Sequence, residues 1–171
     1  MALTDDFDLG RLGLTAGEAR RLTLDVRIDS FSFGGERYSP APAQQPVVLD
    51  IARLTGQGYS LRLRFESRLE GPCMRCLDGA QTTFAVDARE VDQPGGGEEL
   101  DSPYVRDDVL DVRAWARDAL ALALPAQIVC RADCAGLCPT CGANLNAAGP
   151  DHQHPREPDP RFAKLSEIRF G

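Results

Sequence analysis

Four cysteines fall within twelve residues, and this stretch constrains the fold more than any other. Cys130, Cys134, Cys138 and Cys141 have the spacing C-x3-C-x3-C-x2-C. Few large apolar side chains lie among them, so the stretch cannot fold by burial alone. Short spacings between cysteines let one turn deliver two thiolates to a tetrahedral zinc ion. We therefore expect these four thiols to form one zinc site, with a disulfide or inert thiols as the alternatives.

The two halves of this cluster differ in the strength of their signal. In Cys138-Pro-Thr-Cys141-Gly142, the proline presets the turn and the glycine permits a positive φ beside the second thiolate. The three-residue gap between Cys130 and Cys134 is less typical of such turns. No βαβ pattern surrounds the cysteines, so the thioredoxin type of redox site is not favoured.

A further pair of cysteines, Cys73 and Cys76, lies between two segments with the alternation of a half-buried strand, residues 59–69 and 81–91. The pair therefore falls at the tip of an expected β-hairpin. A C-x-x-C turn in this position is typical of one half of a zinc ribbon. Structural thiols and redox chemistry are the alternatives that the spacing leaves open.

The rest of the chain predicts an α+β fold. Residues 22–28 and 47–54 read as further strands, and residues 111–123 as a helix with Asp111 as its cap and Trp115 in its apolar stripe. We expect a mainly antiparallel sheet, with partial closure into a barrel as an alternative, covered by this helix. The expected organisation is a loosely attached arm (1–20), a β-rich core domain (21–125), and a cysteine-rich metal-binding segment with a short final helix (126–171).

Charge and composition narrow the functional classes. The chain of 171 residues has a formal net charge of −7, which argues against broad non-specific binding of nucleic acid. No apolar run reaches the ~18 residues needed to span a bilayer, and the acidic N-terminus does not resemble a signal peptide. Six cysteines in such a chain favour a reducing compartment and metal binding. We therefore expect a cytoplasmic protein.

Three arginines on one strand face stand out in an acidic chain. Arg62, Arg64 and Arg68 alternate with the apolar residues of segment 59–69 and should share its outer face. A solvated outer face is the plain interpretation. The functional alternative is an anion-binding stripe that, together with Arg75, contacts RNA or a partner.

The ordered motifs of the chain resemble those of the bacterial YceD family, which has relatives in plastids. They are Cys-x-Arg-Cys-Leu at 73–77, Ala-Leu-Ala-Leu-Pro at 121–125, Cys-x-Gly-Leu-Cys-Pro-x-Cys-Gly-x-Asn-Leu-Asn at 134–146, and Asp-Pro-Arg-Phe at 159–162. The resemblance covers roughly residues 20–170. It implies a non-enzymatic ribosome-biogenesis factor that supports accumulation or processing of large-subunit ribosomal RNA. The implied partner is a precursor of that RNA or a ribosomal protein, without a membrane or a small-molecule substrate.

One departure from the family pattern concerns the metal ligands. Many relatives carry Cys-x-Cys after the Asn-Leu-Asn segment, whereas this chain has His152-Gln-His154. Imidazole is also a zinc ligand, so Cys73, Cys76, His152 and His154 form a second possible set, although a polar tail is the plain interpretation. A ribbon pairing Cys73 and Cys76 with Cys138 and Cys141 is a further option. We favour the four clustered thiols because a local site requires no long loop to be closed first.

Two other functions stay open at this point. A thiol-based redox or metal-handling protein would use Cys73 and Cys76, and a reactive thiol there would need nearby cations, of which Arg75 is one. A protein-binding adaptor would use the acidic surface to contact basic ribosomal proteins.

Overall fold

The computed structural model describes residues 3–149 and 151–155, which form two antiparallel sheets and one long helix. Two 3-10 turns, Gly10–Leu12 and Glu98–Leu100, lie between strands. The expected helix at 159–168 lies outside the described residues. The strands and helices are β1 Asp6–Asp8, β2 Ala19–Arg27, β3 Phe31–Phe33, β4 Glu36–Pro40, β5 Gln44–Arg53, β6 Tyr59–Pro72, β7 Gly79–Asp92, β8 Val105–Arg106, β9 Val109–Asp111, α1 Val112–Ala123 and α2 Leu145–Ala148.

The main sheet has the strand order β2-β5-β6-β4-β3, and β7 pairs with β6 on the other side. Strand β6 is its centre because it pairs with β7 along all 14 of its residues, from Tyr59↔Asp92 to Pro72↔Gly79. The predicted antiparallel sheet is therefore confirmed. The alternative of a partly closed barrel is wrong for the described residues, where the outer strands β2 and β7 do not pair and α1 packs against both.

Alternation in β6 places Leu61, Leu63 and Leu69 in the core, each at most 1% exposed. Helix α1 covers that side of the sheet, and its Trp115 is 2% exposed, as predicted. The predicted cap is also present, because the Asp111 carboxylate accepts a hydrogen bond of 2.8 Å from the backbone N–H of Ala114.

Helical spacing from Trp115 and Ala119 would place Leu122 in the apolar stripe of α1, and here the structure differs. It is 88% exposed. It lines an open groove of about 480 Å³ between α1 and β7. Leu120, which is 0% exposed, takes the buried place instead.

The N-terminal segment is more firmly attached than the sequence predicted. Strand β1 pairs with β9 in the small sheet β1-β9-β8, and Leu9 is 1% exposed. Arg113 of α1 binds Asp5 at 3.4 Å and Asp29 at 2.8 Å, which ties the segment to both the helix and the loop after β2. Strand β1 has only three residues, so alternation of apolar residues is too brief there to reveal its pairing from the sequence.

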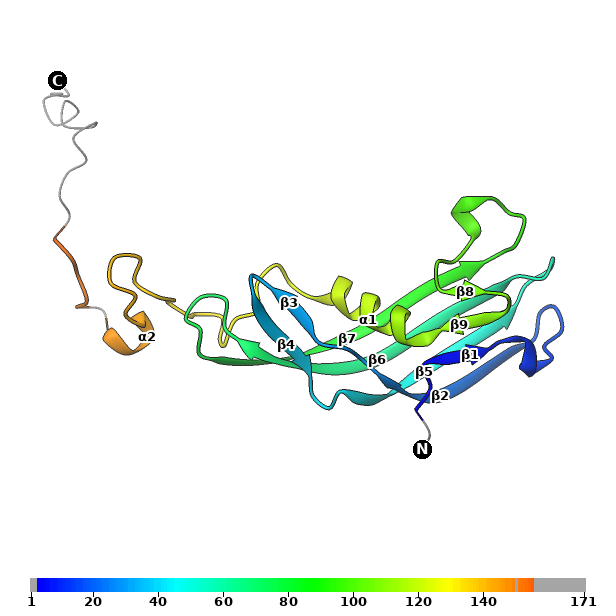
Figure 1. Cartoon of the computed structure of the whole chain (residues 1–171), viewed down its shortest axis with the longest axis horizontal. Coiled ribbons are helices and arrows are strands. Elements are labelled where there is room, and N and C mark those ends of the chain that lie inside the picture. The colour runs from blue at the N-terminus through cyan, green and yellow to red at the C-terminus, as the bar shows by residue number, and fades with distance from the viewer. Residues whose placement is uncertain (1–2, 150, 156–171) are drawn as a thin grey trace, which may run out of the picture.

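The molecule is elongated, and the tip of the β6–β7 hairpin lies toward one end (Figure 1). The β6–β7 hairpin tip and the segment that follows α1 meet there, and α2 lies beyond them. In the described part of the chain, no helix combines the length and the apolar character needed to cross a membrane.

Candidate metal centres

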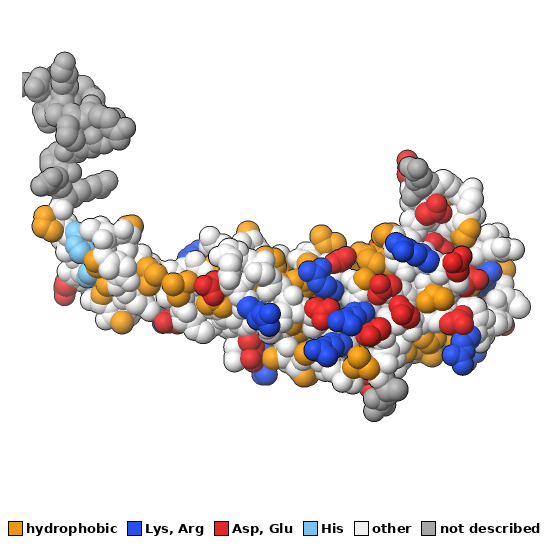
Figure 2. All heavy atoms as spheres, in the orientation of Figure 1, with side chains coloured by type: hydrophobic (Ala, Val, Ile, Leu, Met, Phe, Trp, Pro, Cys, Tyr) orange, Lys and Arg blue, Asp and Glu red, His pale blue; other side chains and the backbone are white. Residues whose placement is uncertain are grey.

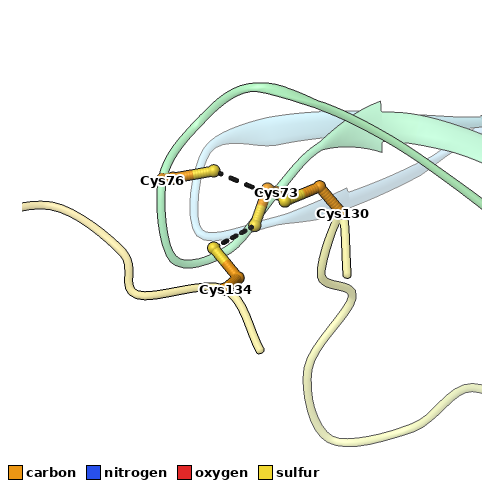
Figure 3. A group of neighbouring side chains, drawn as sticks. All are labelled: Cys73, Cys76, Cys130 and Cys134. Carbon is orange, nitrogen blue, oxygen red and sulfur yellow. Dashed lines mark hydrogen bonds between the residues drawn. The ribbon is translucent and has the colours of Figure 1, made fainter. Parts of the chain in front are cut away.

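Four thiols from two distant segments meet at the hairpin tip. Cys73 and Cys76 come from the turn between β6 and β7, and Cys130 and Cys134 from the segment after α1 (Figure 3). Their sulfur atoms lie within 4.8 Å of one another, with 3.8 Å between Cys73 and Cys134 and 3.7 Å between Cys76 and Cys130. A tetrahedron with Zn–S bonds of about 2.3 Å has edges of roughly 3.8 Å, so the sulfur positions fit one tetrahedral ion. We call this set the proximal centre.

A second group of potential ligands lies farther along the chain. Cys138, Cys141, His152 and His154 place one ligand atom each within 4.8 Å of the others. We call this set the distal centre. Cys138 is buried, whereas Cys141 and His154 are exposed.

The expected single site of Cys130, Cys134, Cys138 and Cys141 is not assembled in this structure. The chain between the two pairs of cysteines runs across the hairpin tip, where the Leu137 N–H donates to the Arg75 carbonyl at 3.0 Å. The first pair therefore faces the tip and the second pair faces the histidines. The expected entropic cost of closing a long loop had favoured the local site. That cost is small here, because β6 and β7 already hold the hairpin tip in place.

Hydrogen bonds within the turn position the hairpin-tip sulfurs. The Cys73 N–H donates to the Asp78 carbonyl at 2.7 Å, and the Leu77 N–H donates to the Cys73 carbonyl at 2.9 Å. Leu77 adopts a left-handed backbone with φ of 65°. The distal turn repeats this geometry, because the Gly142 N–H donates to the Cys138 carbonyl at 2.8 Å and Gly142 has φ of 73°. Each C-x-x-C turn thus forms the same knuckle, defined here as residues 73–77 and 138–142.

Arg75 braces the proximal centre. Its guanidinium donates to the Gln127 side chain at 3.1 Å and to the Cys134 carbonyl at 3.3 Å. The neighbouring Met74 N–H donates to the Ile128 carbonyl at 2.9 Å. In the structure the Arg75 guanidinium holds the two cysteine-bearing segments together. The RNA or partner contact expected for this residue stays a prediction.

Two asparagines that sequence reasoning did not select also support the proximal centre. The Asn146 amide donates to the Cys134 sulfur at 3.4 Å and accepts from the Ala135 N–H at 2.8 Å. The Asn144 amide donates to Asp78 at 2.8 Å, next to the hairpin tip. The sequence feature that could have identified these two residues is the Asn-Leu-Asn run just after the second knuckle. Groups that hydrogen-bond to metal ligands orient them and tune their charge, which is the part these amides would play.

The proximal thiols differ in their readiness to ionise. Burial opposes ionisation of Cys73, but backbone N–H groups, first that of Arg75, outweigh it and lower its pKa to about 6. The Asn146 amide lowers the pKa of Cys134 in the same way. Burial raises the pKa of Cys76 and of Cys130. A divalent cation bound here would hold all four side chains as thiolates and compensate their charge.

The three arginines of the predicted stripe share the outer face of β6, and each is paired with a carboxylate. Arg62 binds Asp87 through two hydrogen bonds of 2.7 and 2.5 Å, Arg64 binds Asp50 at 2.7 Å, and Arg68 lies 3.3 Å from Glu70. Figure 2 shows basic and acidic side chains interspersed over the visible face of the sheet body. Their positive charge is therefore largely balanced locally.

Comparison with known proteins finds relatives of this chain in mycobacteria. Uncharacterized proteins of Mycobacterium tuberculosis and Mycobacterium bovis are each 39% identical over 104 residues, which cover 57% of this chain and 49% of theirs. The chain thus spans about half the length of these relatives. An uncharacterized protein of Mycobacterium leprae is 40% identical over 161 residues, covering 78% of this chain and 73% of its own.

No solved structure matches this chain. The family model described as "Large ribosomal RNA subunit accumulation protein YceD" matches residues 61–169. That range begins in β6 and contains both knuckles, the bracing Arg75 and the two asparagines. The chain therefore belongs to the YceD family.

Proposed function

We propose that this protein is a non-enzymatic factor in ribosome biogenesis that supports the accumulation of large-subunit ribosomal RNA. The observation that carries the proposal is the convergence of Cys73, Cys76, Cys130 and Cys134 on one tetrahedral set. All four lie within the range that matches the family of large ribosomal RNA subunit accumulation proteins. The family suggests the ribosomal role. We propose that the protein acts through the rigid end of the molecule that the proximal centre forms.

Zinc is the ion that this proposal assigns to the proximal centre. Four thiolates in tetrahedral geometry are the donor set of structural zinc sites. Four protein ligands fill the coordination sphere, so no position is left for a substrate or an activated water. The bound ion would then crosslink the β6–β7 hairpin tip to the segment after α1. The proposed function needs no catalytic step.

A basic ribosomal protein is the partner we propose. The net charge of −7 repels the phosphates of RNA and attracts a basic protein. The arginine stripe supports RNA binding weakly, because Arg62, Arg64 and Arg68 are all paired with carboxylates. Direct contact with the RNA precursor through these arginines is the competing outcome of the test below.

The test is co-sedimentation of the tagged full-length chain with precursors of the large ribosomal subunit. We expect the protein in the precursor fractions and, after crosslinking, on a ribosomal protein. Replacing Arg62, Arg64 and Arg68 with Gln should leave this association and its salt dependence unchanged, as should the matched replacement of the exposed Arg11, Arg37 and Arg106. Selective weakening in the first variant, with a flatter salt dependence, would show direct RNA contact instead.

Absence of the wild-type chain from all precursor fractions, together with normal large-subunit RNA levels in cells that lack it, would overturn the ribosomal role.

The redox alternative makes a different prediction. Exchange of a disulfide requires an accessible sulfur, whereas Cys73 is 0% and Cys76 3% exposed. We therefore expect both thiols to resist an alkylating reagent in the native protein and to react once it is unfolded.

A further inference from the structure

We propose that the distal centre, formed by Cys138, Cys141, His152 and His154, is a second divalent-metal site that binds zinc independently of the proximal centre. It goes beyond the proposed function, because it concerns a different ligand set and holds whether or not the chain associates with ribosomal precursors. The sequence suggested these histidines only as partners of Cys73 and Cys76.

The distances between ligand atoms match a tetrahedral site with mixed donors. The Cys141 sulfur lies 3.5 Å from Nε2 of His152 and 3.2 Å from Nε2 of His154, and the two Nε2 atoms are 3.1 Å apart. Bonds of about 2.3 Å to sulfur and about 2.0–2.1 Å to nitrogen give edges of roughly 3.6 Å and roughly 3.3 Å. Each of these three distances lies within a few tenths of an ångström of the corresponding edge.

The facing imidazoles strengthen the assignment. Both histidines turn the same nitrogen, Nε2, toward each other and toward one sulfur, and their rings meet edge to face with centroids 4.8 Å apart. A direct hydrogen bond between the two Nε2 atoms requires one of them to carry a proton, whereas one cation accepts the lone pairs of both Nε2 atoms and the thiolate together. A solvated polar tail gives no reason for this convergence.

Local backbone bonds position the distal ligands. The Cys138 N–H donates to the Ala143 carbonyl at 2.8 Å, which closes the knuckle, and the Ala148 N–H donates to the Asn144 carbonyl at 2.9 Å within α2. Gly149, with φ of 76°, then turns the chain so that the histidines return to the knuckle. A module that spans residues 138–154 thus brings its own ligands together without any from the sheet.

Accessibility distinguishes the two centres. The proximal sulfurs are buried or half-buried beneath the hairpin tip, whereas Cys141 and His154 are exposed. In Figure 2 the two imidazoles lie at the surface near the end of the described chain, away from the sheet body. A chelator can therefore reach the distal ion first, and its removal leaves the core of the protein in place.

The experiment measures bound zinc in the full-length protein, purified with a tag that contains no histidine. We expect two zinc ions per wild-type chain. Replacing His152 and His154 together with Gln should remove one ion and leave the melting temperature of the sheet domain unchanged. The matched control replaces the neighbouring exposed Asp151 with Asn and Gln153 with Ala, and should keep two ions.

Cobalt substitution and chelation supply two further readouts. Cobalt(II) in the wild type should show the combined spectrum of a four-thiolate site and a two-thiolate, two-imidazole site, and the double histidine variant should show the four-thiolate spectrum alone. A chelator should release zinc from the wild type in two phases, and the variant should lack the fast phase. A double histidine variant that holds as many zinc ions as the wild type, whether one or two, would overturn the proposal.

Discussion

Leu77 and Gly142 occupy equivalent positions in the two knuckles, each directly after the second cysteine. Both have a left-handed backbone, with φ of 65° and 73°. A glycine adopts this conformation freely, whereas a leucine does so at a cost of about 1–2 kcal/mol. Leu77 is also 59% exposed, so burial of its side chain does not offset this cost.

We predict that Leu77→Asn stabilises the metal-loaded protein by about 0.5–1 kcal/mol, because asparagine tolerates the left-handed conformation better. Chemical denaturation of the two proteins at equal zinc loading measures the difference. Gly142→Ala is the opposite test, and should weaken zinc binding at the distal centre by about tenfold, which corresponds to about 1.4 kcal/mol. A destabilised Leu77→Asn protein would show that the leucine side chain contributes a contact that the structure does not account for.

The Asp50 carboxylate lies between two guanidiniums, with Arg21 at 2.5 Å and Arg64 at 2.7 Å from it. The hydrogen bond from Arg21, supported by Arg64, lowers its pKa below the ordinary 3.8 despite some burial. A lowered folded-state pKa gives stability that is present above the unfolded pKa and lost as the pH falls through the folded value.

Asp50→Asn should therefore cost about 1 kcal/mol near neutral pH, and the difference from wild type should shrink below about pH 4. Urea denaturation across the pH range follows both proteins. A difference that stays constant from pH 7 to pH 3 would mean that the ion pairs contribute nothing and that the asparagine acts through shape.

Among the strands and helices, the sequence predicted those whose apolar residues show the alternation of a strand or the periodicity of a helix. The strands at 59–69 and 81–91 and the capped helix at 111–123 correspond to β6, β7 and α1. The pairing of β1 with β9 was missed because β1 has only three residues, too few to show a period. The grouping of the cysteines was missed for another reason: it depends on where the segment after α1 crosses the hairpin tip, which spacing along the chain does not encode.

Trp115→Ala tests how α1 packs on the sheet. The ring is 2% exposed and lies 6.1 Å from that of Tyr104, so we expect a loss of about 3–5 kcal/mol. Thermal or chemical denaturation measures it. Leu122→Ala on the same helix is the matched control and should cost little, because Leu122 is 88% exposed.

Gly71 tests the close contact beside the hairpin tip. A Cβ atom added at Gly71 would lie only 2.3 Å from Cδ1 of Tyr38, whose side chain is 1% exposed. Gly71→Ala must therefore move the buried ring or strand β6, and should cost about 1–3 kcal/mol. Gly79→Ala at the other side of the tip meets nothing within 4 Å and is the control. Equal stability of the two variants would contradict this arrangement.

In the complete fold, the sheet body and the cysteine-bearing end are joined through the proximal centre. The segment after α1 contributes Ile128, 2% exposed, to the core and Cys130 and Cys134 to the hairpin tip. The predicted division of the chain at residue 125 stays a prediction, as does the RNA contact through the arginine stripe. The family was predicted from ordered motifs, and the match to residues 61–169 confirms it.

The metal ligands group into a proximal and a distal centre, and X-ray absorption at the zinc edge can test this grouping. The sample is a variant with Cys138 and Cys141 both replaced by Ser, loaded with one zinc ion per chain. We expect four sulfur neighbours at about 2.3 Å, supplied by Cys73, Cys76, Cys130 and Cys134. Two sulfur and two nitrogen neighbours would contradict it, because the remaining ion would then be held by Cys73 and Cys76 with the histidines.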